Sequence, residues 1–178
     1  LGDIAFEAIV GSRENSADPH HNSSKRKIQE GCLLIDSGLR IDKMCSDITW
    51  TYWVGSEPPE DFLNAYDALL IAKEEANKHF VEGENHRAPA MACRNKLSEL
   101  GYDHEELFFH GLGHAMGYET HDIGIPISWK SPDTGNLKAN MVYSNEPGLY
   151  WQGKWGIRLE DDIVVGKKEP NVLTYCPK

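Results

Sequence analysis

The sequence lacks an apolar run long enough to cross a bilayer. Its longest such runs, residues 32–35 and 68–72, are far shorter than the ~20 residues that a transmembrane helix needs. Aromatic residues, by contrast, are plentiful, with five Trp, seven Tyr and five Phe. A membrane-spanning protein and a disordered chain are therefore both excluded, and we expect no membrane partner.

Basic residues are also scarce. The chain has 18 Lys and Arg against 28 Asp and Glu, which gives a formal net charge of −10. The basic residues cluster only at positions 25–27. Because nucleic-acid binding needs clustered positive charge, nucleic acid is excluded as the main partner.

Cysteine is limited to positions 32, 45, 93 and 176, and no two of these have C-x-x-C spacing. This excludes a zinc ribbon and a thioredoxin-like motif, and it is typical of a reducing compartment, so we expect a cytoplasmic protein. A chain of 178 residues suits one domain, residues 1–178. Because the first residue is Leu1 rather than methionine, we expect part of a longer chain.

The order of predicted elements indicates an α+β fold. We expect strands at 4–11, 31–41, 47–54, 141–150 and 156–165, and a short one at 172–176. Helices are expected from Pro58 to about 79 and from 89 to 100. Residues 12–29 and 119–138 are predicted to be irregular, and 108–117 a short strand or turn. The elements are ordered as strands, then two helices, then strands again. This order differs from the strand–helix alternation that builds a parallel α/β sheet.

Four carboxylates interrupt apolar, strand-like segments: Asp36, Asp47, Glu146 and Glu160. A buried carboxylate without a partner costs several kcal/mol. Arg158 can pair with one of the four but not with all of them. One or two divalent cations are the simplest common partner. The alternative is that the four are ordinary surface charges on half-buried strands.

The spacing of these acids adds a second indication. Asp36 and Asp47 lie eleven residues apart, and Glu146 and Glu160 fourteen apart, so each hairpin can bring its two carboxylates face to face. His114 lies between the pairs among glycines, which allow close backbone approach. Such a set suits Mn²⁺, Co²⁺, Fe²⁺ or Zn²⁺ in a shared two-metal site. Two ions ~3.5–4 Å apart can hold a bridging hydroxide and polarise a carbonyl.

Seven motifs from residue 6 to residue 161 resemble those of the pita-bread metallopeptidases, in particular the prolidase and aminopeptidase P branch. They are Phe6-Glu-Ala-Ile-Val-Gly-Ser with Asn15 and His20, Leu34-Ile-Asp36-Ser-Gly38, Ser46-Asp47-Ile-Thr49, His110-Gly-Leu-Gly-His114, His121-Asp122, Asn145-Glu146-Pro-Gly-Leu-Tyr150 and Gly156-Ile-Arg-Leu-Glu160-Asp. The resemblance implies a pita-bread fold, with a curved antiparallel sheet, flanking helices and two pseudo-symmetric halves.

The resemblance also implies a metal-ligand set. Asp36 would bind one ion, Asp47 and Glu160 would bridge two, and His114 and Glu146 would complete the second. Of the four metals that suit these residues, manganese is favoured.

The same resemblance implies catalytic roles. Glu146 would take the proton of the attacking water, and His121 would hydrogen-bond the oxyanion. His20 and His110 would line the pocket, with His21 as the alternative to His20. Tyr150 and Arg158 would contact the substrate or support the residues that do.

Some features differ from the family pattern. The helices that usually precede the first strand are missing, as is the separate N-terminal domain, so we expect an N-terminally incomplete catalytic domain whose full-length form is a homodimer. Arg13 stands where the family usually has Gly, and Trp50 replaces the usual Arg after Asp-Ile-Thr.

The function implied is metal-dependent hydrolysis of the bond between an N-terminal residue and proline in short peptides. An Xaa-Pro dipeptidase and an Xaa-Pro aminopeptidase are equally compatible with the sequence. The alternatives are a methionine aminopeptidase of the same fold and a non-catalytic peptide-binding module. The second alternative would usually show lost ligands, whereas every ligand position here is filled.

Overall fold

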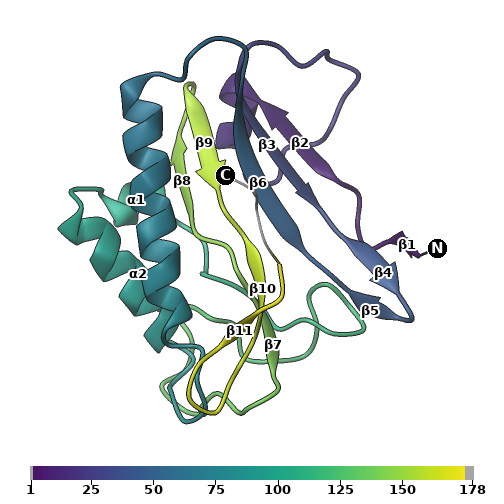
Figure 1. The fold of residues 1–178 in the computed structure, drawn as a ribbon, viewed down its shortest axis with the longest axis vertical. Coiled ribbons are helices and arrows are strands. Elements are labelled where there is room, and N and C mark those ends of the chain that lie inside the picture. The colour runs from purple at the N-terminus through teal and green to yellow at the C-terminus, as the bar shows by residue number, and fades with distance from the viewer. Residues whose placement is uncertain (1, 175–178) are drawn as a thin grey trace.

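The structure is a computed structural model that describes residues 2–174. Within these residues, antiparallel strands form three three-stranded sheets and one two-stranded sheet, and two long helices lie along one side (Figure 1). The mixed α and β content agrees with the expected fold class. No helix in residues 2–174 is both long and apolar enough to cross a membrane.

The N-terminal half is built on β2 (Ile9–Ser12), β3 (Gly31–Ser37) and β6 (Ile48–Val54), hydrogen-bonded in the order β2-β3-β6. A smaller sheet holds β1 (Asp3–Ile4), β4 (Leu39–Ile41) and β5 (Met44–Cys45). The 3-10 helix η1 (Arg13–Ala17) lies inside the expected loop.

The expectation of continuous strands at 4–11 and 31–41 was wrong, because each divides between the two sheets. The physical reason for the second break is Gly38, where a Cβ atom would lie 2.0 Å from the carbonyl oxygen of Ser46. The chain crosses another backbone there at a distance that only glycine allows. Strand β3 therefore ends one residue after Asp36.

The C-terminal half contains β7 (Val142–Asn145), β8 (Gly148–Trp151), β9 (Trp155–Arg158), β10 (Asp161–Val164) and β11 (Asn171–Val172). Strand β7 pairs with β10, and β8 pairs with β9. The expected strands at 141–150 and 156–165 are thus each broken, at Glu146 and at Glu160, and Pro147 contributes no N–H to a ladder. The last expected strand, 172–176, extends beyond the described residues.

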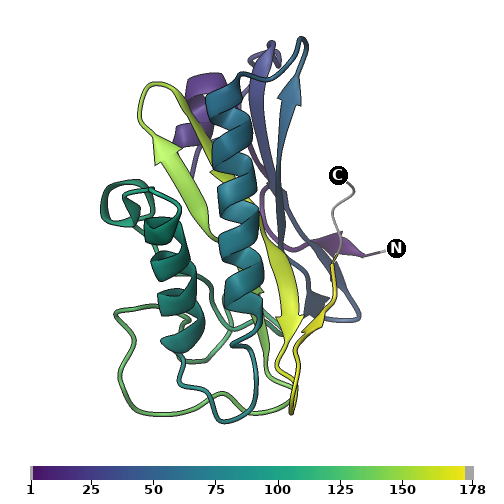
Figure 2. The ribbon, with the colours of Figure 1, turned by 60° about the vertical axis from the view of Figure 1, so that its left-hand side comes forward.

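Helices α1 (Glu60–Asn77) and α2 (Ala88–Glu99) pack side by side against the C-terminal strands (Figures 1 and 2). Pro59 precedes α1. The acidic residues in the first turn of α1 stabilise the helix, because their negative charge lies at the positive end of the helix dipole. The short helix α3 (His104–Leu107) was not predicted; Asp103 caps it by accepting from two backbone N–H groups. Residues 108–117 form isolated bridges rather than a strand.

The core between α1, α2 and the strands predicts the cost of a cavity. Leu69 of α1 is fully buried, whereas Leu63 of the same helix is 46% exposed. We expect Leu69→Ala to lower the free energy of unfolding by about 2–5 kcal/mol, and Leu63→Ala by less than about 1 kcal/mol. Urea unfolding of both variants measures this, and equal losses would contradict the described packing.

Candidate metal centre

A cavity of about 690 Å³ brings together most of the functional residues expected from the sequence. Its walls include all five expected metal ligands, three of the expected catalytic histidines and one arginine. These residues are Asp36, Asp47, His114, Glu146, Glu160, His20, His110, His121 and Arg158. Tyr150 and His21 are outside the set of described residues that line this cavity.

The strand pairing explains how the acidic residues from the two halves of the chain come to line the same cavity. Asp36 is the penultimate residue of β3 and lies directly opposite Thr49 of β6. Asp47 immediately precedes β6, so the expected face-to-face pairing of Asp36 with Asp47 is offset by two residues. Glu146 and Glu160 lie at the breaks between β7 and β8 and between β9 and β10.

Three overlapping groups of side chains have ligand atoms within 4.8 Å of one another. They are Asp36–Asp47–Glu160, His114–Glu146–Glu160 and Asp47–His114–His121. His114 Nε2 lies 3.4 Å from both Asp47 Oδ2 and Glu146 Oε1. Together the three groups offer four carboxylates and two imidazoles, a donor set that suits divalent transition metals.

Unpartnered oxygen atoms test whether these residues fit a metal ion. Asp36 Oδ1 and Glu160 Oε1 are buried, with no hydrogen-bond partner within residues 2–174. An unsatisfied buried carboxylate oxygen is costly, and a cation is the partner that neutralises it. The donor set therefore fits a site for divalent cations.

Burial controls the electrostatics of the carboxylates. It raises the pKa of Asp36 to about 6, although Arg158 acts in the opposite direction. It raises the pKa of Glu146 to about 7. The pKa of Glu160 is raised well above its ordinary value, by burial first and then by the neighbouring acids Glu146 and Asp47. Crowded acids of this kind bind either protons or metal ions.

The two adjacent imidazoles shift in opposite directions. Burial lowers the pKa of His114, but Asp47 and Glu146 outweigh burial, so that the net pKa is raised. Burial and the charge of His114 lower the pKa of His121, whose ring centroid lies 3.8 Å from that of His114. Burial also lowers the pKa of His110, to about 4. His110 and His121 therefore favour the neutral form at pH 7.

Arg158 connects several segments around the cavity and is only 3% exposed. Its guanidinium donates to Asp36 Oδ2 at 2.7 Å and to Thr49 Oγ1 at 3.1 Å. It also donates to the Tyr150 hydroxyl at 3.1 Å and to the carbonyl of Pro19, which precedes His20, at 3.2 Å. One buried cation thereby fixes β3, β6, β8 and the loop that carries His20.

Tyr150 is connected to the cavity through His110, whose Nε2 lies 3.0 Å from the tyrosine hydroxyl. Burial raises the pKa of Tyr150 to about 12, so the phenol stays protonated. Of the two candidate histidines in the first loop, His20 lines the cavity.

Close backbone contact positions His114. A Cβ on Gly113 would lie 2.0 Å from the carbonyl oxygen of Ser144. The Ser144 hydroxyl accepts from the His114 N–H at 3.0 Å and donates to Glu146 Oε1 at 3.3 Å. The serine thus links two expected ligands from different segments.

Sequence reasoning assigned no role to Thr49 or Ser144. Thr49 donates to Glu160 Oε2 and accepts from Arg158, and it follows Asp47 by two residues on the same face of the strand. Side chains alternate between the two faces of a strand, so the two-residue spacing from Asp47 was the signal that could have identified Thr49. Phe6, Ile9 and Pro126 also line the cavity, and they were not predicted.

The fold and this donor set define an α+β protein whose cavity residues fit divalent cations. A model of the metallopeptidase family M24 matches residues 1–167, and the chain belongs to that family. This match, together with the solved structures described next, confirms the pita-bread fold and the resemblance to the prolidase and aminopeptidase P branch.

Solved structures and curated proteins give the same result. The X-Pro aminopeptidase from Thermotoga maritima is 35% identical, with a TM-score of 0.90, over 98% of this chain and 48% of that one. The recombinant prolidase from Thermococcus sibiricus is 37% identical, with a TM-score of 0.90, over 99% and 47%. The probable dipeptidase PepE of Mycobacterium bovis is 33% identical over 98% and 45%. The chain spans about half the length of the curated relatives it matches.

The raised pKa of Glu146 predicts a pH-dependent effect in protein freed of metal by a chelator. A carboxyl whose pKa is raised to about 7 in the folded state contributes stability below its ordinary value of 4.5, and this contribution is lost as the pH rises through 7. Glu146→Gln should therefore raise the melting temperature at pH 8, and raise it less at pH 5.5. Thermal unfolding at both pH values measures this.

The exposed Glu57 provides the control, because Glu57→Gln should change stability little at either pH. An effect of Glu146→Gln that is equal at pH 5.5 and pH 8 would contradict the raised pKa.

Proposed function

We propose that the protein is a dinuclear metallo-exopeptidase that hydrolyses the bond between an N-terminal residue and proline, as an Xaa-Pro dipeptidase or an Xaa-Pro aminopeptidase. The observation that carries this proposal is the overlap of the three ligand groups on Asp47, His114 and Glu160 at one cavity. The names of the relatives, which include prolidases and an X-Pro aminopeptidase, support the choice of substrate.

Two of the groups would hold the two ions. Asp36, Asp47 and Glu160 would bind the first, and His114, Glu146 and Glu160 the second, with Asp47 completing the bridge. Divalent ions supply Lewis acidity and lower the pKa of a bound water. Because Asp47 and Glu160 would serve both ions, a single two-metal centre fits these residues better than two separate metal sites.

The protein's own residues supply proton transfer and orientation. Glu146 takes the proton of the attacking water, because its carboxylate would lie beside a water held by the ions. His121 donates a hydrogen bond to the carbonyl oxygen as negative charge develops on it, because a neutral imidazole still carries one N–H. His20 and His110 contact the peptide around the scissile bond.

Arg158 and Tyr150 fit a supporting role better than direct substrate binding. The guanidinium has four protein acceptors, so it orients Asp36 and the loop before His20. Tyr150 orients His110 through its hydroxyl. We therefore place both residues behind the side chains that touch the substrate.

Manganese as the native metal, proline at the second position of the peptide, a homodimeric full-length protein and a cytoplasmic location belong to the same proposal. They rest on the family resemblance and its implications rather than on contacts in this cavity. The length of the accepted peptide depends on what closes the cavity.

Hydrolysis of an Xaa-Pro dipeptide and an Xaa-Pro tripeptide, with Mn²⁺ or Co²⁺ added and with chelator as the blank, tests the proposed activity. We expect metal-dependent cleavage, and the preferred peptide length then distinguishes the two kinds of peptidase.

The variant Asp47→Asn tests the shared ligand. It should lower kcat by a factor of at least about 100 with the fold retained, because it weakens a ligand that both ions would share.

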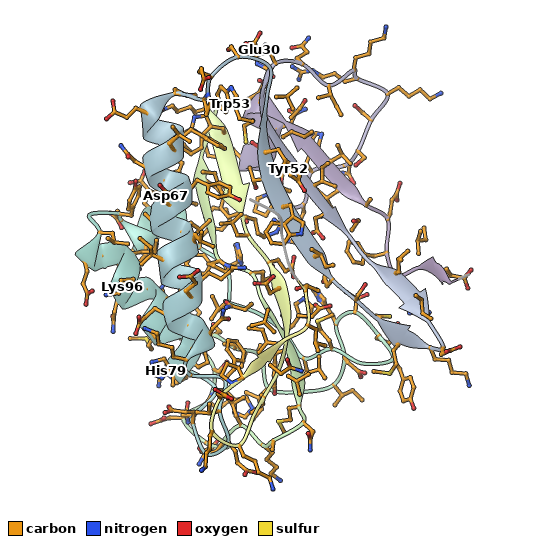
Figure 3. All side chains as sticks on the ribbon, in the orientation of Figure 1. Glu30, Tyr52, Trp53, Asp67, His79 and Lys96 are labelled. Carbon is orange, nitrogen blue, oxygen red and sulfur yellow. The ribbon has the colours of Figure 1, made fainter. Side chains whose placement is uncertain are left out.

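Asp67 provides the matched control, since it is exposed on α1 away from the cavity (Figure 3). Asp67→Asn should leave turnover unchanged. Unchanged turnover in Asp47→Asn would overturn the two-metal proposal. Metal binding without cleavage of either peptide would favour a methionine aminopeptidase or a peptide-binding module.

His121→Ala separates the proposed hydrogen bond from metal binding. We expect kcat to fall about 10²-fold, because a donor to the developing oxyanion is lost, while the metal affinity falls much less. Steady-state kinetics and metal titration measure the two effects. His79, labelled just beyond the end of α1 in Figure 3, is outside the set of described residues that line the cavity, and the control variant His79→Ala should affect neither. Equal losses of kcat and metal affinity would argue that His121 is a metal ligand instead.

A further inference from the structure

The residues next to the two glutamates form a second set of contacts on the other side of the strands. Asn145 precedes Glu146, Asp161 follows Glu160, and the two face each other directly in the β7–β10 ladder. Both are buried, with Asn145 at 0% and Asp161 at 5% exposure. Since successive side chains along extended backbone point to opposite faces, these two lie behind the glutamates that line the cavity.

Both of these residues contact Lys73 of α1. The Lys73 ammonium forms a buried ion pair with Asp161, and the Lys73 carbonyl accepts from Asn145 Nδ2 at 3.2 Å. Asn145 Nδ2 also donates to Asn77 Oδ1, one helical turn further along, at 2.7 Å. A single helix turn therefore holds both strands at the positions adjacent to Glu146 and Glu160.

The surroundings leave the ion pair little freedom. Lys73 is 3% exposed, and its ammonium lies 5.4 Å from the centre of the Trp50 ring. The second oxygen of Asp161 accepts from the Thr174 hydroxyl at 3.0 Å. Both carboxylate oxygens of Asp161 are thus engaged, so its side chain has one defined orientation.

Stability alone is a poor explanation for this arrangement. The desolvation cost of a buried ion pair largely offsets its attraction, and an apolar pair of similar volume often stabilises a fold as well or better. What the pair supplies is a fixed geometry, because the ammonium and the carboxylate must meet at one point. That point lies one residue from Glu160, whose carboxylate takes part in two of the three ligand groups.

We propose that Lys73 is a positioning residue for Glu146 and Glu160. Its ammonium, through Asp161, and its carbonyl, through Asn145, fix the two strand breaks so that both glutamates meet His114 at one point. The inference rests on the proposed function of these glutamates as metal ligands. Residues that support ligands in this way commonly contribute a factor of about 10–100 to metal affinity or activity.

The test uses the double variant Lys73→Met/Asp161→Asn, which removes both charges and nearly preserves side-chain volume. We expect it to unfold cooperatively, to bind Mn²⁺ about 10-fold more weakly in calorimetric titration, and to lose kcat with KM for the peptide nearly unchanged. A purely structural pair would change the melting temperature and leave the metal affinity of the folded protein unaltered.

An exposed ion pair on the same helix provides the matched control. Lys154, in the turn between β8 and β9, pairs with Asp61 of α1. Lys154→Met/Asp61→Asn removes the same two charges between α1 and a strand pair but is remote from the glutamates. We expect its metal affinity to equal that of the unmodified protein.

A milder variant keeps the proposal testable if the first one does not fold. Asn77→Ala removes one acceptor of Asn145 and leaves the ion pair in place, and we expect a loss of metal affinity of about 3-fold, smaller than that of the double variant. Unchanged Mn²⁺ affinity in a folded double variant, or in Asn77→Ala if the double variant does not fold, overturns the proposal.

Cleavage of an Xaa-Pro peptide tests the proposed function independently of the positioning role. If the unmodified protein binds Mn²⁺, and the Lys73 variant binds it more weakly, but neither cleaves an Xaa-Pro peptide, the positioning role stands and the proposed peptidase fails.

Discussion

Four carboxylates share one small buried region, and this constraint organises the rest of the structure. The ligand oxygens of Asp36, Asp47 and Glu160 lie within 4.8 Å of one another, as do those of Glu146 and Glu160, and like charges this close repel when they are partly removed from water. Burial is the largest cause of the raised pKa values of Asp36, Glu146 and Glu160, and repulsion from neighbouring acids adds to it. Without a cation the cluster relaxes by taking up protons, and with divalent ions it becomes a binding site. The local instability of the metal-free cluster is thus the source of its affinity.

The fold meets this constraint by interrupting strands rather than by adding loops. Asp36 lies at the end of β3 beside the Gly38 crossing, and Glu146 and Glu160 lie at facing breaks between strand pairs. A residue at a strand end keeps one neighbour fixed by the ladder while its own side chain enters the cavity. Asp36, Glu146 and Glu160 are therefore each held by a hydrogen-bonded strand on at least one side, which suits a site that needs sub-ångström precision.

The sequence predicted local features well and tertiary ones poorly. The predicted helices agree with α1 and α2 to within two residues, because the flanking prolines and the apolar spacing are local signals. The break at Gly38 was missed, because it depends on the approach of Ser46. The acids were recognisable as charges inside apolar segments. The two-residue offset of Asp47 from Asp36 could not be predicted, because the register between β3 and β6 depends on the intervening turn. Helical spacing placed Lys73 with the apolar residues of the helix, but its pairing with Asp161 was not predicted, since the two are 88 residues apart.

Three described carboxylates have a buried oxygen without a partner, and the two that belong to the ligand groups, Asp36 and Glu160, follow one rule. Arg158 occupies Oδ2 of Asp36 and leaves Oδ1 without a partner, and Thr49 occupies Oε2 of Glu160 and leaves Oε1 without one, within the described residues. In each case the protein fixes the orientation of the carboxylate through one oxygen and leaves the other for a cation. Had both oxygens been satisfied, a metal ion would have had to displace a protein hydrogen bond. Had neither been bound, each side chain would lose rotamer entropy on metal binding. Half-satisfied carboxylates avoid both costs. Asp162 has the same pattern outside the ligand groups, with Oδ1 unpartnered and Oδ2 accepting from the Asp47 N–H at 3.3 Å, so an unpartnered oxygen indicates the metal centre only where the ligand atoms also converge.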